Sequence, residues 1–187
     1  MSRVILETAN GIALGLWAGV LAFVGVAAAI AFPMMKTLDP TLPAYAAYEG
    51  GHWRIAAGQV MNRLFNIADD IGFVTIVVSL IALAVLMSGG RLARTRLAPV
   101  RMALWVLIAG VSVYITAGPR TEMNALAEQH WAHARAGDNQ LAEEAREAFD
   151  AQHHTASALH AAQFSLVLLA LGVNIAGAAL GPRADEA

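Results

Sequence analysis

Histidines are the side chains of this chain best suited to chemistry, and all six lie in or next to the two polar segments that follow the first and third long apolar runs. They are His52, His130, His133, His153, His154 and His160. Imidazole nitrogens bind transition metals such as copper, and side chains three or four residues apart share one helical face. A metal site is expected to draw on His130, His133, His153, His154 and His160. The alternative is that a polar cap tolerates histidines, which hydrocarbon excludes.

A second group of polar side chains lies where the stretch after His52 turns apolar. Asn62, Asn66 and one of two adjacent aspartates fall on a single helical face. Such groups at the edge of a membrane span mark an entry site for a proton, ion or solute, or they cap neighbouring helices at a water-exposed end. With three residues at the start of the last apolar run, the predicted outer-mouth cluster comprises Asn62, Asn66, Asp69, Asp70, His153, Ser157 and His160.

No catalytic residue is predicted. His153, Ser157 and His160 follow one another at helical spacing, but the sequence has no Gly-x-Ser-x-Gly turn to expose a nucleophile. A haem-dependent oxidoreductase is a further alternative, for which only His160 lies close enough to a span to bind an axial position. The sequence requires no cofactor, and copper or haem are the two that these residues suggest.

The elements that position these residues are four predicted transmembrane helices. The chain has 187 residues, of which 58% are apolar, and the stretches free of Lys, Arg, Asp and Glu are 8–35, 71–90, 102–119 and 151–182. About 20 apolar residues in a helix cross a hydrocarbon core, and lipid offers no partner for unpaired backbone amides. The sequence therefore predicts an all-α, four-helix membrane bundle with spans near 12–34, 71–87, 102–116 and 159–180.

The orientation follows from a short basic loop between the second and third spans. Arg91, Arg94, Arg96 and Arg101 lie in this loop, which carries no acid. Basic residues concentrate in cytoplasmic loops, so both termini are predicted to lie on the cytoplasmic side of a bacterial inner membrane. The segments 35–70 and 118–158 then lie outside.

The outer segments are predicted to be largely helical. From Trp53 a helical pattern runs unbroken into the second span. Beyond residue 118, two helices separated by Gly137 form a small cap, and the second of them is predicted to continue through His153 into the fourth span. Residues 1–187 are thus expected to form a single membrane domain with an extracytoplasmic helical cap.

Small and amide side chains indicate how the spans pack. Glycines that let the first and last helices approach closely are Gly11, Gly15, Gly19, Gly172 and Gly177. Asn174 is interpreted as the one strongly polar amide deep in the membrane, bonding across to another helix or marking an oligomer face.

Composition excludes some functions. The chain has no cysteine, which excludes thiol catalysis and disulfides, and no basic motif indicates nucleic acid. The leading interpretation is an interaction or structural module whose partners are the lipid bilayer and either a second copy or another membrane protein. The alternative is binding or transport of a metal or small solute at the outer mouth.

Three stretches resemble a known family. Residues 16–23 (LWAGVLAF) with 31–33 (AFP), residues 57–65 (AGQVMNRLF), and residues 149–157 with their paired histidines are similar to segments of the transmembrane protein 205-like family. That resemblance implies four spans, no assigned catalytic activity, and a loose kinship with the copper-resistance-D-like group and with haem-pathway oxidation. The paired histidines and the insertion 45–53 differ from the family pattern.

Overall fold

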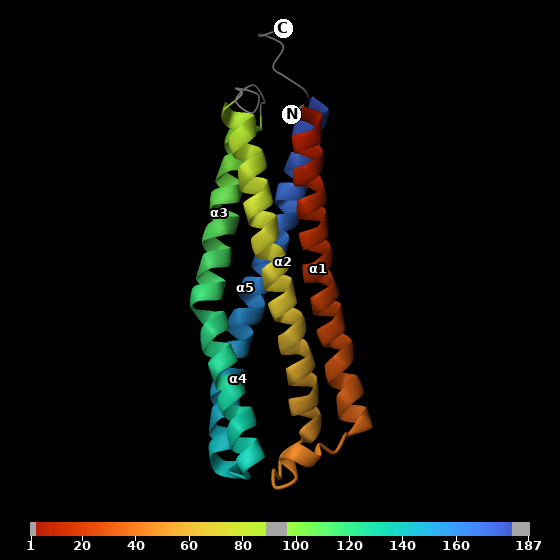
Figure 1. Ribbon diagram of the computed structural model, residues 1–187, viewed down its shortest axis with the longest axis vertical. Coiled ribbons are helices and arrows are strands. Elements are labelled where there is room, and N and C mark those ends of the chain that lie inside the picture. Colours follow the sequence, from red (N-terminus) through yellow and green to blue (C-terminus); the bar gives the residue numbers. More distant parts are fainter. Residues whose placement is uncertain (1–2, 89–96, 181–187) are drawn as a thin grey trace. The chain divides into compact units, whose positions relative to one another are not determined.

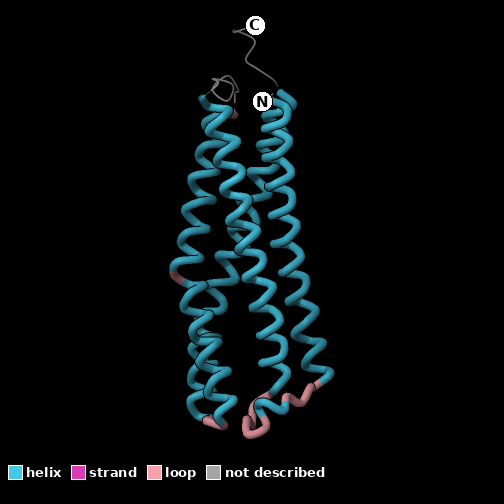
Figure 2. The backbone as a smooth tube through the Cα atoms, viewed as in Figure 1, coloured by secondary structure: helices cyan, strands magenta, loops and turns pink. Residues whose placement is uncertain are grey.

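The computed structural model describes residues 3–88 and 97–180, and helices account for nearly all of them (Figures 1 and 2). The elements in chain order are α1 (Arg3–Leu38), the short 3-10 helix η1 (Pro43–Tyr45), α2 (His52–Ser88), α3 (Ala98–Ala117), α4 (Pro119–Ala136) and α5 (Asn139–Leu180). The all-α class predicted from the sequence is confirmed.

Four helical stretches are long and apolar enough to cross a membrane, with α3 and α4 forming one of the four. They are Arg3–Leu38, His52–Ser88, Ala98–Ala136 and Asn139–Ala179. The chain is therefore an integral membrane protein by length and composition. At about 1.5 Å per residue, α1 is about 54 Å long, which exceeds a hydrocarbon core of about 30 Å. Because α2 and α5 are continuous, both predicted extensions into the second and fourth spans are confirmed.

Proline and glycine set the ends of α4. Pro119 occupies the first turn, where its missing N–H is not needed. Gly137 ends the helix with φ of 77°, a left-handed conformation that suits glycine. A Cβ at Gly137 would also lie 2.9 Å from the Cβ of Ala47. The predicted break between the two cap helices is thus confirmed and is doubly enforced.

The chain divides into two compact units, and α1, α2, α3 and α5 each contribute to both. Unit 1 holds the described residues 3–22, 68–88, 97–113 and 161–180, and unit 2 holds residues 23–67 and 114–160. The single membrane domain expected from the sequence stays a prediction.

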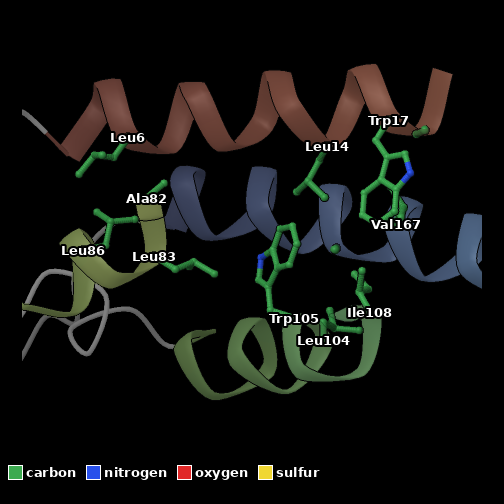
Figure 3. Packing of buried hydrophobic residues seen from close by; sticks show 12 residues of the cluster. Leu6, Leu14, Trp17, Ala82, Leu83, Leu86, Leu104, Trp105, Ile108 and Val167 are labelled. Carbon is green, nitrogen blue, oxygen red and sulfur yellow. The ribbon is translucent and has the colours of Figure 1, made fainter. Parts of the chain in front are cut away.

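Unit 1 has an apolar core built from all four of its helical segments (Figure 3). Trp17 of α1 and Trp105 of α3 are its largest members, each at most 3% exposed. A Cβ at Gly72 of α2 would stand 2.8 Å from the Trp17 Nε1 atom, so glycine leaves the space that this indole occupies. The core residues are Leu6, Leu14, Trp17, Ala18, Ala82, Leu83, Leu86, Leu104, Trp105, Ile108, Val167 and Ala170.

Unit 2 has a smaller core in which tyrosines take part. Tyr45 and Tyr48, from the segment between α1 and α2, pack with Ile55, Ala134 and Ala142. This core holds the connecting segment, defined as residues 39–51, against the ends of α2, α4 and α5.

The prediction that five glycines let α1 and α5 approach closely is correct at Gly11 and wrong at Gly15, Gly19 and Gly172, while a Cβ at Gly177 would lie 3.8 Å from Arg101 of α3. A Cβ at Gly11 would lie 3.2 Å from the Asn174 side-chain nitrogen, so α1 and α5 do approach closely there. No described atom beyond the neighbouring helical turns lies within 4 Å of a Cβ built at Gly15, Gly19 or Gly172. These three glycines therefore face away from the packed interior.

Candidate functional site

A buried ion pair joins α1 to α3 in unit 1. Arg101 Nη1 donates to Glu7 Oε1 over 2.9 Å, and Nη2 donates to Oε2 over 2.7 Å. Glu7 is 6% exposed and Arg101 is 2% exposed. Two parallel charge-assisted bonds make this the strongest geometry that a guanidinium and a carboxylate adopt.

Two asparagines extend the pair into a network across α1, α3 and α5. Asn174 Oδ1 accepts from Arg101 Nη2 at 2.7 Å and from Asn10 Nδ2 at 2.8 Å. Asn174 Nδ2 donates to the backbone carbonyl of Glu7 over 3.3 Å. Because Asn174 Oδ1 faces a guanidinium, which only donates, the orientations of both amides are fixed.

Arg3 adds a second cation at the edge of this network. Its Nε lies 3.8 Å from Glu7 Oε1, one helical turn along α1, and its Nη2 donates to the backbone carbonyl of Gly177 over 3.3 Å. The glutamate thus lies between one buried and one half-buried arginine. We define the buried polar network as Arg3, Glu7, Asn10, Arg101 and Asn174.

The sequence prediction missed most of this network. The Asn174 bond across to another helix is confirmed, and its partner Asn10, which is 1% exposed, is a second buried amide that the sequence interpretation did not name. Assigning Arg101 to a loop is also wrong, since α3 begins at Ala98. A usable signal was present: Asn10 lies on the same helical face as the core residues Leu6 and Leu14.

The other three arginines that set the predicted orientation, Arg91, Arg94 and Arg96, lie outside the described residues. Because Arg101 belongs to α3, the predicted orientation depends on those three arginines alone.

Part of the predicted outer-mouth cluster gathers around Arg120 in unit 2. Arg120 Nη2 donates to Asn66 Oδ1 over 2.7 Å and to Asn62 Oδ1 over 3.1 Å. Its guanidinium also lies 5.4 Å from the centre of the Phe65 ring. The His160 ring packs on the same phenyl at 5.3 Å. The amides therefore bind an arginine of α4, a partner that no sequence pattern indicated.

The remaining members of that cluster lie at other points along α2 and α5. Asp69 and Asp70 belong to α2 within unit 1, where Asp70 is exposed and Asp69 is half-buried. Ser157 is exposed, and the exposed His153 stacks on Phe149 at 5.7 Å. The cluster as a functional site stays a prediction.

The predicted metal ligands are distributed over α4 and α5. His130 is buried, with Nδ1 2.9 Å from the carbonyl of Ala142. His133 is half-buried in the last turn of α4, and His154 is exposed. Among the described residues, no three His, Asp or Glu side chains form a group that could hold a metal ion. The metal site stays a prediction.

Hydrogen bonds fasten the connecting segment in unit 2. Asn139 at the start of α5 accepts from the Glu49 amide at 2.9 Å and donates to the Ala47 carbonyl at 3.3 Å. The Tyr45 hydroxyl accepts from Gln59 Nε2 at 2.8 Å and from Arg135 at 3.2 Å. Burial and the negative charge of Glu143 raise the pKa of Tyr48 above its ordinary value of 10.0.

Comparisons with known proteins give no family model, curated protein or solved structure that matches this chain. The resemblance to the transmembrane protein 205-like family accordingly stays a prediction.

Proposed function

We propose that this chain is a non-enzymatic interaction module of the bacterial inner membrane, and that its copies associate through α1. The observation that supports this is the open glycine face of α1, formed by Gly15 and Gly19. A Cβ built at either position would meet no described atom beyond the neighbouring helical turns within 4 Å. Large apolar side chains that border it, Ile12 and Leu16, are 66% and 58% exposed.

Small residues four apart on a membrane helix favour association because they let two backbones approach closely. Apolar side chains gain little free energy by moving from lipid tails into a helix interface, so close packing is the main source of stability for helix association in a membrane. Gly15 and Gly19 follow Gly11 at this spacing, and of the three only Gly11 approaches another helix among the described residues. A second copy is the partner that presents the same face and buries both glycines by symmetry.

The buried polar network supports a structural use of the interior. Glu7 and Arg101 neutralise each other, and Asn174 bonds to Arg101, to the Glu7 backbone carbonyl and to Asn10. Charged groups engaged in this way position helices. On this proposal, the interior of unit 1 has a structural role, and association with a second copy takes place at its surface.

Association is tested by fluorescence energy transfer between labelled copies in liposomes at increasing dilution in lipid. The Gly15→Leu/Gly19→Leu variant is expected to weaken association by about tenfold or more, the change that roughly 1.4 kcal/mol of lost packing gives. Gly110→Leu, at an exposed and equally open glycine of α3, is the matched control and should associate as the native chain does. Native copies that do not associate, or a double variant that associates normally, would overturn the proposal.

We further propose that both termini are cytoplasmic. The chain has no cysteine, so single cysteines can be placed without background. A cysteine at Ala47 is expected to react with an impermeant maleimide in intact cells, and one at Ser2 only after lysis. The reverse pattern would invert the orientation.

Metal or solute handling and haem chemistry remain predictions, because no contact among the described residues favours them. Copper content and haem absorbance of protein purified without a histidine tag test both.

A further inference from the structure

His52 connects two points of the connecting segment in unit 2. The Leu42 backbone N–H donates to His52 Nδ1 over 3.0 Å. On the other side of the ring, Nε2 lies 3.2 Å from the backbone carbonyl of Tyr48. One imidazole thus closes the chain between residues 42 and 48, together with the Tyr45 and Tyr48 amides, which donate to the carbonyls of Leu42 and Tyr45.

These two contacts fix the protonation state of the ring. A backbone N–H can only donate, so Nδ1 must offer its lone pair and carry no proton. A carbonyl oxygen can only accept, so Nε2 must carry the ring proton and donate it to Tyr48. The described arrangement therefore requires a neutral His52 with its proton on Nε2.

Protonation removes one of these contacts. A proton on Nδ1 would point at the Leu42 N–H, and two donors facing each other form no hydrogen bond. His52 is also the first residue of α2, where the helix dipole disfavours positive charge. The imidazolium thus loses the contact that joins His52 to Leu42.

The surroundings of the ring include several charged or titratable groups. Tyr48 stacks on His52 with ring centres 6.1 Å apart, and the His130 ring of α4 meets Tyr48 edge-on. Arg54 of α2 and Glu143 and Arg146 of α5 act electrostatically on Tyr48. Arg146 is itself bound to Glu143 and Asp150, and Asp150 also lies 3.8 Å from Arg54.

We propose that His52 is a pH-sensitive latch: the neutral ring holds the connecting segment closed, and protonation releases it at Leu42. Release would loosen the packing of Tyr45 and Tyr48 of this segment against Ile55, Ala134 and Ala142 of unit 2. This regulation is independent of association through α1, since it involves only residues of unit 2.

Amide hydrogen exchange at Leu42 tests the latch in the full-length protein in nanodiscs. The measurement runs from about pH 7.5 to about pH 4.5, a range that includes the ordinary pKa of histidine side chains, about 6.5. Expressing the rates as protection factors removes the intrinsic pH dependence of amide exchange. Protection of Leu42 should fall by at least about fivefold on acidification, as expected for the loss of one hydrogen bond. Constant protection would overturn the proposal.

Three variants assign the effect to His52. In His52→Asn, the side-chain oxygen can accept from Leu42 and does not titrate, so protection should persist at both pH values. In His52→Phe, protection of the Leu42 amide should be low at both pH values. The matched control, His154→Asn at an exposed histidine, should lose protection as the native chain does. Acid-induced loss that survives in His52→Asn would overturn the proposal, as would ring nitrogen shifts that place the proton on Nδ1 at neutral pH.

Discussion

The two units differ in how deeply their paired charged side chains are buried. In unit 1, Glu7 and Arg101 are almost completely buried and bind each other. In unit 2, Arg146 binds Glu143 and Asp150, whose side chains are 50% and 52% exposed. An apolar surrounding retains a charge only together with its partner, whereas water stabilises exposed charges singly. The same helices therefore meet two different surroundings along their length.

The largest effect expected from this comparison is the loss of one buried partner. Arg101→Leu removes both short bonds to the buried Glu7 and leaves only Arg3, at 3.8 Å, beside it, which should lower the free energy of unfolding by about 3–5 kcal/mol. Glu7→Leu/Arg101→Met removes both charges and should restore most of that stability. Unfolding in mixed detergent micelles, followed by circular dichroism, measures both. A single variant as stable as the native chain would show that the pair does not hold the helices.

A smaller loss is expected from crowding the unit 1 core. Gly72→Ala places a methyl group against the buried Trp17 indole, which should cost about 1–3 kcal/mol in the same unfolding measurement. Gly110→Ala is the control, because a Cβ there meets no described atom outside its own part of α3. Equal stability of the two variants would contradict the packing of Trp17 against α2.

The exposed pairs of unit 2 should contribute less. Arg146→Ala is expected to change the free energy of unfolding by only about 0.2–1 kcal/mol, and added salt should reduce this difference further. Salt should leave the effect of Arg101→Leu nearly unchanged, since buried pairs are screened less. A salt-insensitive effect at Arg146 would remove the contrast between the units.

The smallest effect concerns Tyr48 at alkaline pH. Its pKa is raised by burial first and by Glu143 second, so the folded state favours the neutral phenol. The raised pKa of Tyr48 leaves the free energy of unfolding unchanged below pH 10.0 and lowers it as the pH rises from there through that raised pKa. Tyr48→Phe should remove that part of the alkaline loss in thermal unfolding. An identical alkaline profile in the variant would argue against burial of the phenol.

Helix positions were the part of this protein most open to prediction. Charge-free stretches located the four spans, and unbroken helical patterns from Trp53 and through His153 located the extensions. Gly137 was identified as a break because a left-handed residue ends a helix locally. These features depend on neighbours within a few residues, which the sequence displays directly.

Polar partners were the part least open to prediction. Glu7 and Arg101 are 94 residues apart, and Arg120 lies 54 residues from Asn66. The sequence marked Glu7 as the end of a charge-free stretch and Arg101 as a loop residue, because a charge next to an apolar run usually faces water. Only the packing of α1 against α3 turned both side chains inward.

The sequence alone therefore determined that this protein is helical, where its helices run and that the chain is apolar enough to enter a membrane, because each follows from local composition and periodicity. The tertiary structure decided which polar groups are buried together. Glu7 pairs with Arg101, Asn10 meets Asn174, and His52 contacts the backbone of Leu42 and Tyr48. Each of these contacts depends on which helix faces lie against one another, and that is a property of the packed chain.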